Sequence, residues 1–350
     1  MTATIPEDAA LEPAGAPTGA RRLAGRSSGL DFLRAAACVL VTIFHLRTVL
    51  GVDFGPLNRI VEGGDAGVYI FFALSGYLLY RPFVKGDVDL GDYSLKRAAR
   101  ILPGYFVALV ALLALTQNPL PLAHPLPYLT MTASYNVELR GFLGNAWTLS
   151  AELIFYVLLP VFARFAAGDE IRRLAIVALG SITLSLVYLM GFYEGNEWLL
   201  GAFPFVAYAF VPGMLLAVIE VRRPSLFARF STPWVPIVGL LGILVETQLR
   251  AWPIALGAGI GTPLLIGWLL SVRVPFAKAL SFAGGASYAL YLWHKDLFIS
   301  FGVAGLLIAI VGSALSWALV ERPILDRAHA LAARRRLAVK PTPIVTAAPL

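Results

Sequence analysis

The sequence is short of charged residues, cysteine and histidine, and each shortage excludes a class of protein. Charged residues make up 14% of the 350 residues, whereas soluble domains contain about 25%. The single cysteine, Cys38, excludes a disulfide within the chain, and we expect it to pack as a small apolar side chain. The four histidines lack metal-ligand spacing and no cysteine cluster accompanies them, so no metal site is predicted.

Apolar residues, by contrast, are abundant, at 58% of the chain with a mean hydropathy of +0.76. A membrane span needs about 20 mostly apolar residues, and about ten segments approach that length. They are residues 31–50, 66–84, 101–117, 146–165, 174–192, 201–220, 233–249, 253–271, 285–301 and 303–321. We therefore predict an all-α, polytopic membrane protein with about ten transmembrane helices.

The net charge of +7 comes from basic residues in short segments between apolar runs, a pattern that argues against nucleic-acid binding. If the N-terminus lies inside, most Lys and Arg residues fall on the cytoplasmic side, which predicts that both termini are cytoplasmic. We expect residues 1–28 to be a disordered cytoplasmic tail, 29–325 the membrane domain, and 326–350 a basic, Pro- and Ala-rich cytoplasmic tail. The expected location is the cell inner (plasma) membrane.

The first predicted span carries two ionisable residues, Arg34 and His45, eleven positions apart. Eleven helical steps return to within about 20° of the starting direction, so the two residues share one face, about 16 Å apart. An ionisable residue inside a span is costly and by default indicates function. The simpler interpretations are that Arg34 anchors at the interface and that His45 hydrogen-bonds a neighbouring helix.

Glu152 lies in the fourth predicted span, about 9 Å below its outer end and at a depth similar to that of His45. A carboxylate paired with His45 would fix the imidazole tautomer and form the dyad of a general base. The alternatives are a structural pair, or a pair between Glu152 and Arg140 near the outer surface.

The ninth predicted span contains His294, followed by Lys295 and Asp296. We expect His294 to be a hydrogen-bonded packing residue beside Trp293. The alternative is that His294 lines the same cavity as His45. Lys295 and Asp296 are expected to form a local charge pair or to mark the outer end of the span.

Other candidate groups lie where predicted spans meet the membrane surface. Asp65 precedes the second span at its outer mouth, and Arg97 and Arg100 lie at the cytoplasmic mouth of the third. The two arginines are ordinary positive-inside residues or, together with Arg34, a collar that binds phosphate. The loop of about residues 118–145 is long enough to cover an opening on the outer face.

Six segments carry motifs in a fixed order. They are GLDFLRAAACVLVTIFHL (29–46), GVYIFFALSGYLL (67–79), KRAARILPGY (96–105), WTLSAELIFY (147–156), ASYALYLWHKDLF (286–298) and ERP (321–323). In this order and spacing the chain resembles the acyltransferase-3 family of bacterial integral membrane O-acyltransferases, including its Arg-x10-His signature at Arg34 and His45. Two positions depart from the family pattern: Tyr69 stands where many relatives carry Asp, and Lys295-Asp296 replaces a Trp-Pro pair.

The resemblance implies transfer of an acyl group, often acetyl, from acyl-CoA to a hydroxyl of a carbohydrate, a glycolipid or a macrolide. Acyl-CoA is then a cosubstrate, and no permanently bound cofactor is expected. We expect His45 and Glu152 to be catalytic. We expect the CoA phosphates to bind Arg34, Arg97 and Arg100.

The remaining substrate contacts are expected at Asp65, Tyr69, Ser75 and His294. Ser75, Tyr77 and Tyr69 are candidates for stabilising the oxyanion that acyl transfer requires. The competing hypothesis is a transporter or flippase for a glycolipid or polysaccharide, with His45 and Glu152 as a proton relay. The sequence predicts neither the acceptor nor the oligomeric state.

Overall fold

The structure is a computed structural model that describes residues 28–191, 201–249 and 256–339. Within those ranges all regular secondary structure is helical, which confirms the predicted fold class. The long helices are α1 (Ser28–Leu50), α3 (Ala66–Lys85), α4 (Leu90–Thr116), α7 (Trp147–Ala166), α8 (Glu170–Gly191), α10 (Val211–Arg222), α12 (Trp234–Leu249), α13 (Leu256–Ser271), α14 (Ala277–Phe301), α15 (Ala304–Ser316) and α16 (Arg322–Val339).

Short helical turns connect the long helices. On the connections are η2 (Gly55–Leu57), α2 (Asn58–Glu62), α5 (Leu120–Ala123), α6 (Pro125–Leu129), η3 (Ala133–Tyr135), η4 (Gly144–Ala146), α9 (Phe203–Val206), η6 (Ala207–Ala209), α11 (Pro224–Phe227) and η7 (Ala228–Ser231), with a π-helical turn, η8 (Trp317–Glu321), after α15. The expected tail at 1–28 lies outside the described residues except for its last residue, Ser28, which begins α1.

Each of the ten predicted spans overlaps a helix, but not all of these helices have the length and apolar composition of a span. Seven helical segments in the described ranges qualify, or up to eight if a pair bent by 80° counts as one span. Among the others, α13 has 16 residues, and α14 carries Lys295 and Asp296 in its second half. The chain is therefore a multi-pass membrane protein, with fewer spans by this measure than the sequence pattern predicts.

Helix α1 lies between α14 and α3, and two glycines set how closely these helices approach. A Cβ atom at Gly284 of α14 would lie 2.6 Å from the Asp31 carbonyl oxygen, and one at Gly67 of α3 would lie 2.4 Å from that of Ala37. Any larger residue would push the helices apart, as is typical of small residues at membrane helix interfaces. The close packing brings the side chains of α1 onto those of α14.

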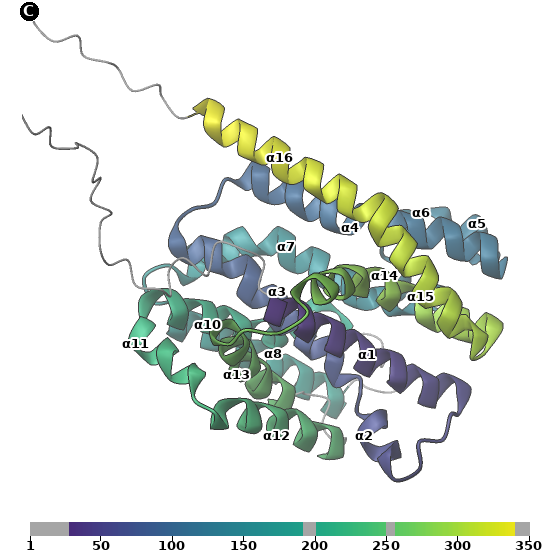
Figure 1. Ribbon diagram of the computed structural model, residues 1–350, viewed down its shortest axis with the longest axis horizontal. Helices are drawn as coiled ribbons and strands as arrows, with labels where there is room; N and C mark the ends of the chain where they lie inside the picture. Colours follow the sequence, from purple (N-terminus) through teal and green to yellow (C-terminus); the bar gives the residue numbers. More distant parts are fainter. Residues whose placement is uncertain (1–27, 192–200, 250–255, 340–350) are drawn as a thin grey trace, which may run out of the picture.

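The first part of the expected C-terminal tail, up to Val339, is helical. It belongs to α16, which runs beside α4 (Figure 1). The Arg336 guanidinium holds the start of α4, with its Nε 2.9 Å from Asp92 Oδ2. The basic composition that suggested a tail therefore belongs to a helix that is docked on the bundle, and residues 340–350 lie outside the described part.

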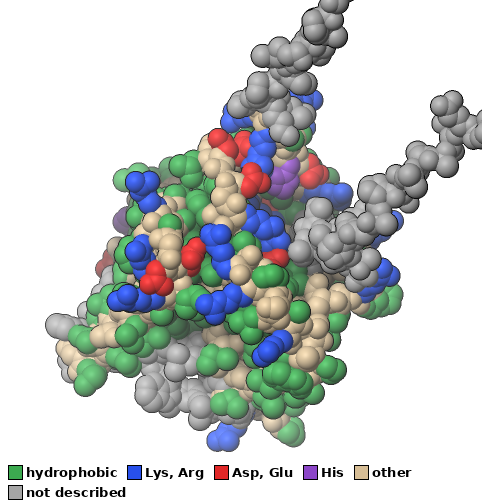
Figure 2. All heavy atoms as spheres, turned by 90° about the vertical axis from the view of Figure 1, so that its left-hand side faces the viewer, with side chains coloured by type: hydrophobic (Ala, Val, Ile, Leu, Met, Phe, Trp, Pro, Cys, Tyr) green, Lys and Arg blue, Asp and Glu red, His purple; other side chains and the backbone are tan. Residues whose placement is uncertain are grey.

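One end of the bundle is rich in basic residues. It includes the α3–α4 and α7–α8 connections and the C-terminal end of α10, where Arg222 pairs with Glu170 at 3.1 Å. Figure 2 shows this end, the left-hand side of Figure 1, with Lys and Arg side chains gathered among a few acidic ones. We call it the basic end. The first turns of α1 and α4 lie at the same end, and α1 runs from there toward the opposite end.

Candidate functional site

Two histidines form a buried hydrogen-bonded pair where α1 meets α14. His45 Nδ1 lies 2.9 Å from His294 Nε2, and His294 Nδ1 lies 2.8 Å from the Leu290 carbonyl oxygen. His294 is fully buried and His45 is 9% exposed. The close packing of α1 against α14 therefore gives His45 a partner 249 residues away in the chain.

The hydrogen bond between His294 and the Leu290 carbonyl determines which ring nitrogens of this pair carry hydrogen. A carbonyl oxygen only accepts, so His294 Nδ1 carries the hydrogen and donates it to Leu290. In the neutral pair His294 Nε2 then accepts, and His45 Nδ1 donates to it. His45 Nε2 is left with its lone pair, which is the state of a general base.

His45 lines a cavity of about 720 Å³, which we call the histidine cavity. Its walls come from α1, α3, the segment between η3 and η4, and α14. Two of the predicted substrate contacts, Asp65 and Tyr69, lie on this wall. The predicted cover loop contributes to the wall as well, through the residues Ser134, Val137, Arg140, Gly141 and Gly144.

A second cavity, of about 280 Å³, lies nearer the basic end, and we call it the arginine cavity. It is lined by Arg34, Arg97 and Arg100, which the sequence predicted as one phosphate-binding group. Val68 and Tyr291 line both cavities, so the two cavities are neighbours, one on either side of these side chains. Arg34 and His45 lie on one face of α1 but line different cavities: Arg34 lines the arginine cavity and His45 lines the histidine cavity.

Neighbouring side chains hold the three guanidinium groups in place. Arg34 Nη1 lies 2.9 Å from Asp31 Oδ1. The Arg97 guanidinium lies 5.9 Å from the centre of the Tyr156 ring, and that of Arg100 lies 5.5 Å from the ring of Tyr288. Aromatic rings attract cations over their faces. The arrangement presents three positive groups to a small cavity and is suited to binding phosphate.

The predicted pair between His45 and Glu152 is wrong. Glu152 accepts a hydrogen bond from the Ser75 hydroxyl and lines the arginine cavity, so α7 presents it toward α3. The alternative partner, Arg140, lines the other cavity. The position expected for a carboxylate beside His45 is occupied by His294, because α14 packs against α1 more closely than α7 does.

Three other residues differ from the substrate or oxyanion contacts expected of them. His294 is fully buried and lines neither cavity, so it is the hydrogen-bonded packing residue of the first interpretation and contacts His45 instead of a substrate. The Tyr77 hydroxyl donates to Glu220 at 2.7 Å, beside the ion pair of Glu220 with Arg81, and this excludes it as an oxyanion donor. The Ser75 hydroxyl likewise donates a hydrogen bond to Glu152.

The sequence interpretation did not assign Lys295, Arg140 and Tyr291 to the site. All three line the histidine cavity. The signal available for Lys295 was its position directly after His294. No sequence signal places Arg140 there, because its position depends on how the cover loop folds back onto α14.

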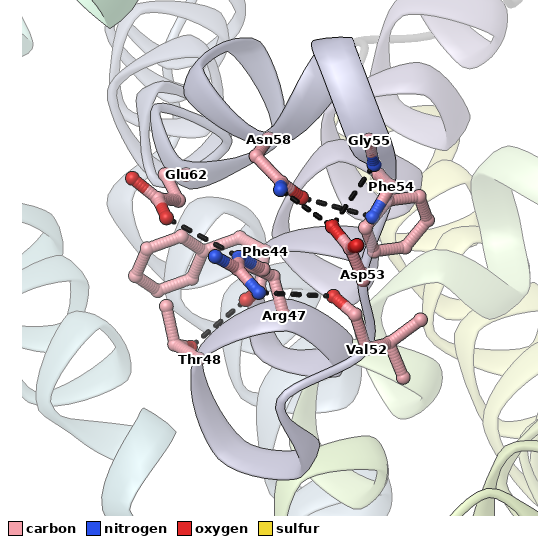
Figure 3. A network of polar contacts seen from close by, with 9 residues as sticks. All are labelled: Phe44, Arg47, Thr48, Val52, Asp53, Phe54, Gly55, Asn58 and Glu62. Carbon is pink, nitrogen blue, oxygen red and sulfur yellow. Dashed lines mark hydrogen bonds and ion pairs between the residues drawn. The ribbon is translucent and has the colours of Figure 1, made fainter.

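A polar network fixes the end of α1 just beyond His45. Figure 3 shows the contacts of Arg47 with Glu62 and of Asp53 with Asn58. Arg47 Nε lies 3.2 Å from Glu62 Oε1, and the amide nitrogen of Asn58 lies 2.6 Å from Asp53 Oδ1. The hydrogen bond from Asn58 is the main reason that the pKa of Asp53 lies below its ordinary value. The loop between α1 and α2 is thus held at both ends, which limits the movement of α1 near His45.

Comparison with known proteins identifies the family. A family model described as an acyltransferase domain, Acyl_transf_3, matches residues 27–321. The exopolysaccharide production protein ExoZ of Rhizobium meliloti is 29% identical over 301 residues, covering 76% of this chain and 91% of that protein. Nodulation protein 10 of Rhizobium leguminosarum bv. viciae is 26% identical, covering 89% of this chain and 96% of that protein.

A further relative, the O-acetyltransferase OatA of Staphylococcus aureus, is 25% identical, covering 85% of this chain but 57% of that longer protein. No solved structure matches the chain. The family model spans most of the described helices, including those that carry both cavities. The chain belongs to the acyltransferase-3 family and is a membrane acyltransferase that transfers groups other than aminoacyl groups.

Proposed function

We propose that this protein transfers an acetyl or other short acyl group from acyl-CoA to a hydroxyl group of a carbohydrate, glycolipid or macrolide acceptor, with His45 as general base. The observation that carries the proposal is the His45–His294 pair. Its proton arrangement leaves His45 Nε2 as a proton acceptor on a cavity that adjoins a cluster of three arginines.

The donor would occupy the arginine cavity. The phosphates of CoA are anionic and would bind Arg34, Arg97 and Arg100 through charge-assisted hydrogen bonds. The separation of Arg34 from His45 on α1, about 16 Å, leaves room for an extended arm to reach from one cavity toward the other. In this arrangement the thioester lies near Val68 and Tyr291, the side chains that line both cavities.

The proposed reaction uses one base and one leaving group. His45 Nε2 removes the proton of the acceptor hydroxyl as its oxygen attacks the thioester carbonyl carbon. The carbon–sulfur bond then breaks, and the thiolate takes the proton from the imidazolium, so that the products are the acyl ester and free CoA thiol. His294 accepts the Nδ1 hydrogen bond throughout and keeps the ring oriented.

Tyr69 and Glu152 take supporting roles in this proposal. Tyr69 lines the same cavity as His45, and its hydroxyl is the proposed donor to the oxyanion. Glu152 holds Ser75 on the wall of the arginine cavity and acts on the donor side instead of on His45.

The distribution of basic residues supports an orientation. Lys and Arg gather at the end that also holds the arginine cavity, and positive residues favour the cytoplasmic side. We place this end, with both termini, in the cytoplasm of a cell whose inner (plasma) membrane holds the bundle. The donor would then enter from the cytoplasm, and the histidine cavity would open toward the outer face.

The test is release of free thiol from acetyl-CoA by purified protein when an acceptor is added. Arg97→Met should raise the KM for acetyl-CoA about tenfold, because one charge-assisted bond to phosphate is lost. Lys85→Met, a change of the same charge at the exposed end of α3, should leave the KM unchanged. A transporter or flippase would release no thiol, and equal KM values for both variants would remove the arginine cavity from the donor site.

A further inference from the structure

The histidine cavity contains two cations that the proposed reaction does not use. Arg140 comes from the segment between η3 and η4, and Lys295 comes from α14. Both side chains are half-buried. Among the residues that the structure describes, neither takes part in an ion pair. Their charges are therefore available to a molecule in the cavity.

The two cations lie close to each other and to His45. Lys295 is within electrostatic range of both His45 and Arg140. The backbone at Gly144 leaves room for the Lys295 ammonium, since Nζ lies 3.4 Å from where a Cβ atom would stand. Two like charges in a partly buried space repel each other unless an anion lies between them.

The nearby carboxylates offset only part of this positive charge. Asp296, the neighbour of Lys295 in sequence, lies within electrostatic range of it, but Asp296 accepts a hydrogen bond from the Leu143 backbone nitrogen at 3.0 Å, does not line the cavity and forms no ion pair with Lys295. Asp65 is the one carboxylate on the described lining. The charged side chains of this lining are therefore two cations and one anion, beside His45.

We propose that the acceptor carries an anionic group, a carboxylate or a phosphate, which Lys295 and Arg140 bind while the acceptor hydroxyl faces His45. This inference rests on the proposed function and narrows its acceptor class from carbohydrates in general to acidic or phosphorylated ones. The donor phosphates do not compete for these cations, because the arginine cavity supplies three of its own.

The test compares three glycosides that differ at one carbon. Methyl β-D-glucuronide carries a carboxylate, methyl β-D-glucoside 6-phosphate a phosphate, and methyl β-D-glucoside a neutral hydroxymethyl group. Isothermal titration with purified wild-type protein should show at least about tenfold tighter binding of one anionic glycoside than of the neutral one. Whichever anionic glycoside binds with the higher affinity shows whether the site prefers a carboxylate or a phosphate.

Lys295→Met and Arg140→Met should each remove most of this preference without changing the affinity for the neutral glycoside. Lys278→Met, at the exposed start of α14, should retain it. Equal affinity for all three glycosides, no binding of either anionic one, or equal weakening of all three in the variants would overturn the proposal. A changed affinity of Lys295→Met for acetyl-CoA would also overturn the proposal, because it would place Lys295 at the donor site.

The binding measurement needs no turnover, so its result is separate from that of the proposed function. If the protein prefers anionic glycosides but releases no thiol, the acyl-transfer proposal fails and the anion site stands. If thiol is released with neutral and anionic glycosides at equal kcat/KM, the anion site fails and acyl transfer stands.

Discussion

Replacing His45 with alanine should lower the rate of acyl transfer by about 10²- to 10⁴-fold, the usual contribution of a general base. His45 Nε2 is the ring nitrogen that the hydrogen bond to His294 leaves as an acceptor, and no other histidine lines either cavity in the described residues. Acetyl-CoA should still bind, because its proposed phosphate ligands lie at the other end of α1. The measurements are thiol release and acetyl-CoA affinity in the same preparation.

His124→Ala is the matched control for this variant. His124 is exposed on the cover loop and lines neither cavity, so its removal should leave both measurements unchanged. If His45→Ala keeps more than about a tenth of the wild-type rate, proton removal by His45 is not part of the reaction. Loss of both transfer and acetyl-CoA binding would instead indicate a disrupted bundle.

Replacing His294 with alanine should lower kcat at least about 10- to 100-fold, the range known for residues that orient the imidazole ligands of metal sites. The His45 Nδ1–H would lose its acceptor, so the ring could turn or adopt the other tautomer. The KM for acetyl-CoA should stay the same, since His294 touches neither cavity. His294→Gln should restore part of the rate, because its amide oxygen can accept the same hydrogen.

The double variant His45→Ala/His294→Ala tells whether His294 positions His45 or only contributes to packing. If His294 acts through His45, the variant lacking both rings should be no slower than His45→Ala alone, because residues that act as a unit are not additive. A further loss of activity in the double variant, or a His294→Gln variant no better than His294→Ala, would show that His294 does not position His45.

The sequence predicted the parts of the site that lie along one helix. The spacing of Arg34 and His45 on α1 depends only on helical geometry, and both residues line cavities in the structure. The grouping of Arg34 with Arg97 and Arg100 followed from charge placement at predicted span ends, and the three do line one cavity. Local periodicity and charge were sufficient for these conclusions.

The partner of His45 could not be predicted in this way. The sequence placed Glu152 at a depth similar to that of His45 and His294 near the middle of its span, and depth does not tell which helix packs against α1. Gly284 in α14 and Gly67 in α3 both permit close approach to α1, so small residues alone do not rank the neighbours. The three-dimensional packing of α1 against α14 decides the pair, and through it the proton arrangement.

Two other differences have a similar origin. The charges of Lys295 and Asp296 suggested a local pair or the outer end of the span. Adjacent helical residues point about 100° apart, so Lys295 lines the histidine cavity while Asp296 accepts from the Leu143 backbone nitrogen. The two lie within electrostatic range of each other but form no ion pair. The basic composition after Glu321 suggested a tail, because nothing in that segment indicates that Asp92 lies nearby to bind Arg336.

In the proposed function, an acyl group passes from a donor at the basic end to an acceptor in the histidine cavity. Sealed proteoliposomes test this passage, with radiolabelled acetyl-CoA trapped inside and a membrane-impermeant acceptor glycoside added outside. We expect label on the external acceptor, from the molecules whose basic end faces the lumen, and none with His45→Ala. Transfer only when donor and acceptor are on the same side of the membrane would contradict the proposed passage.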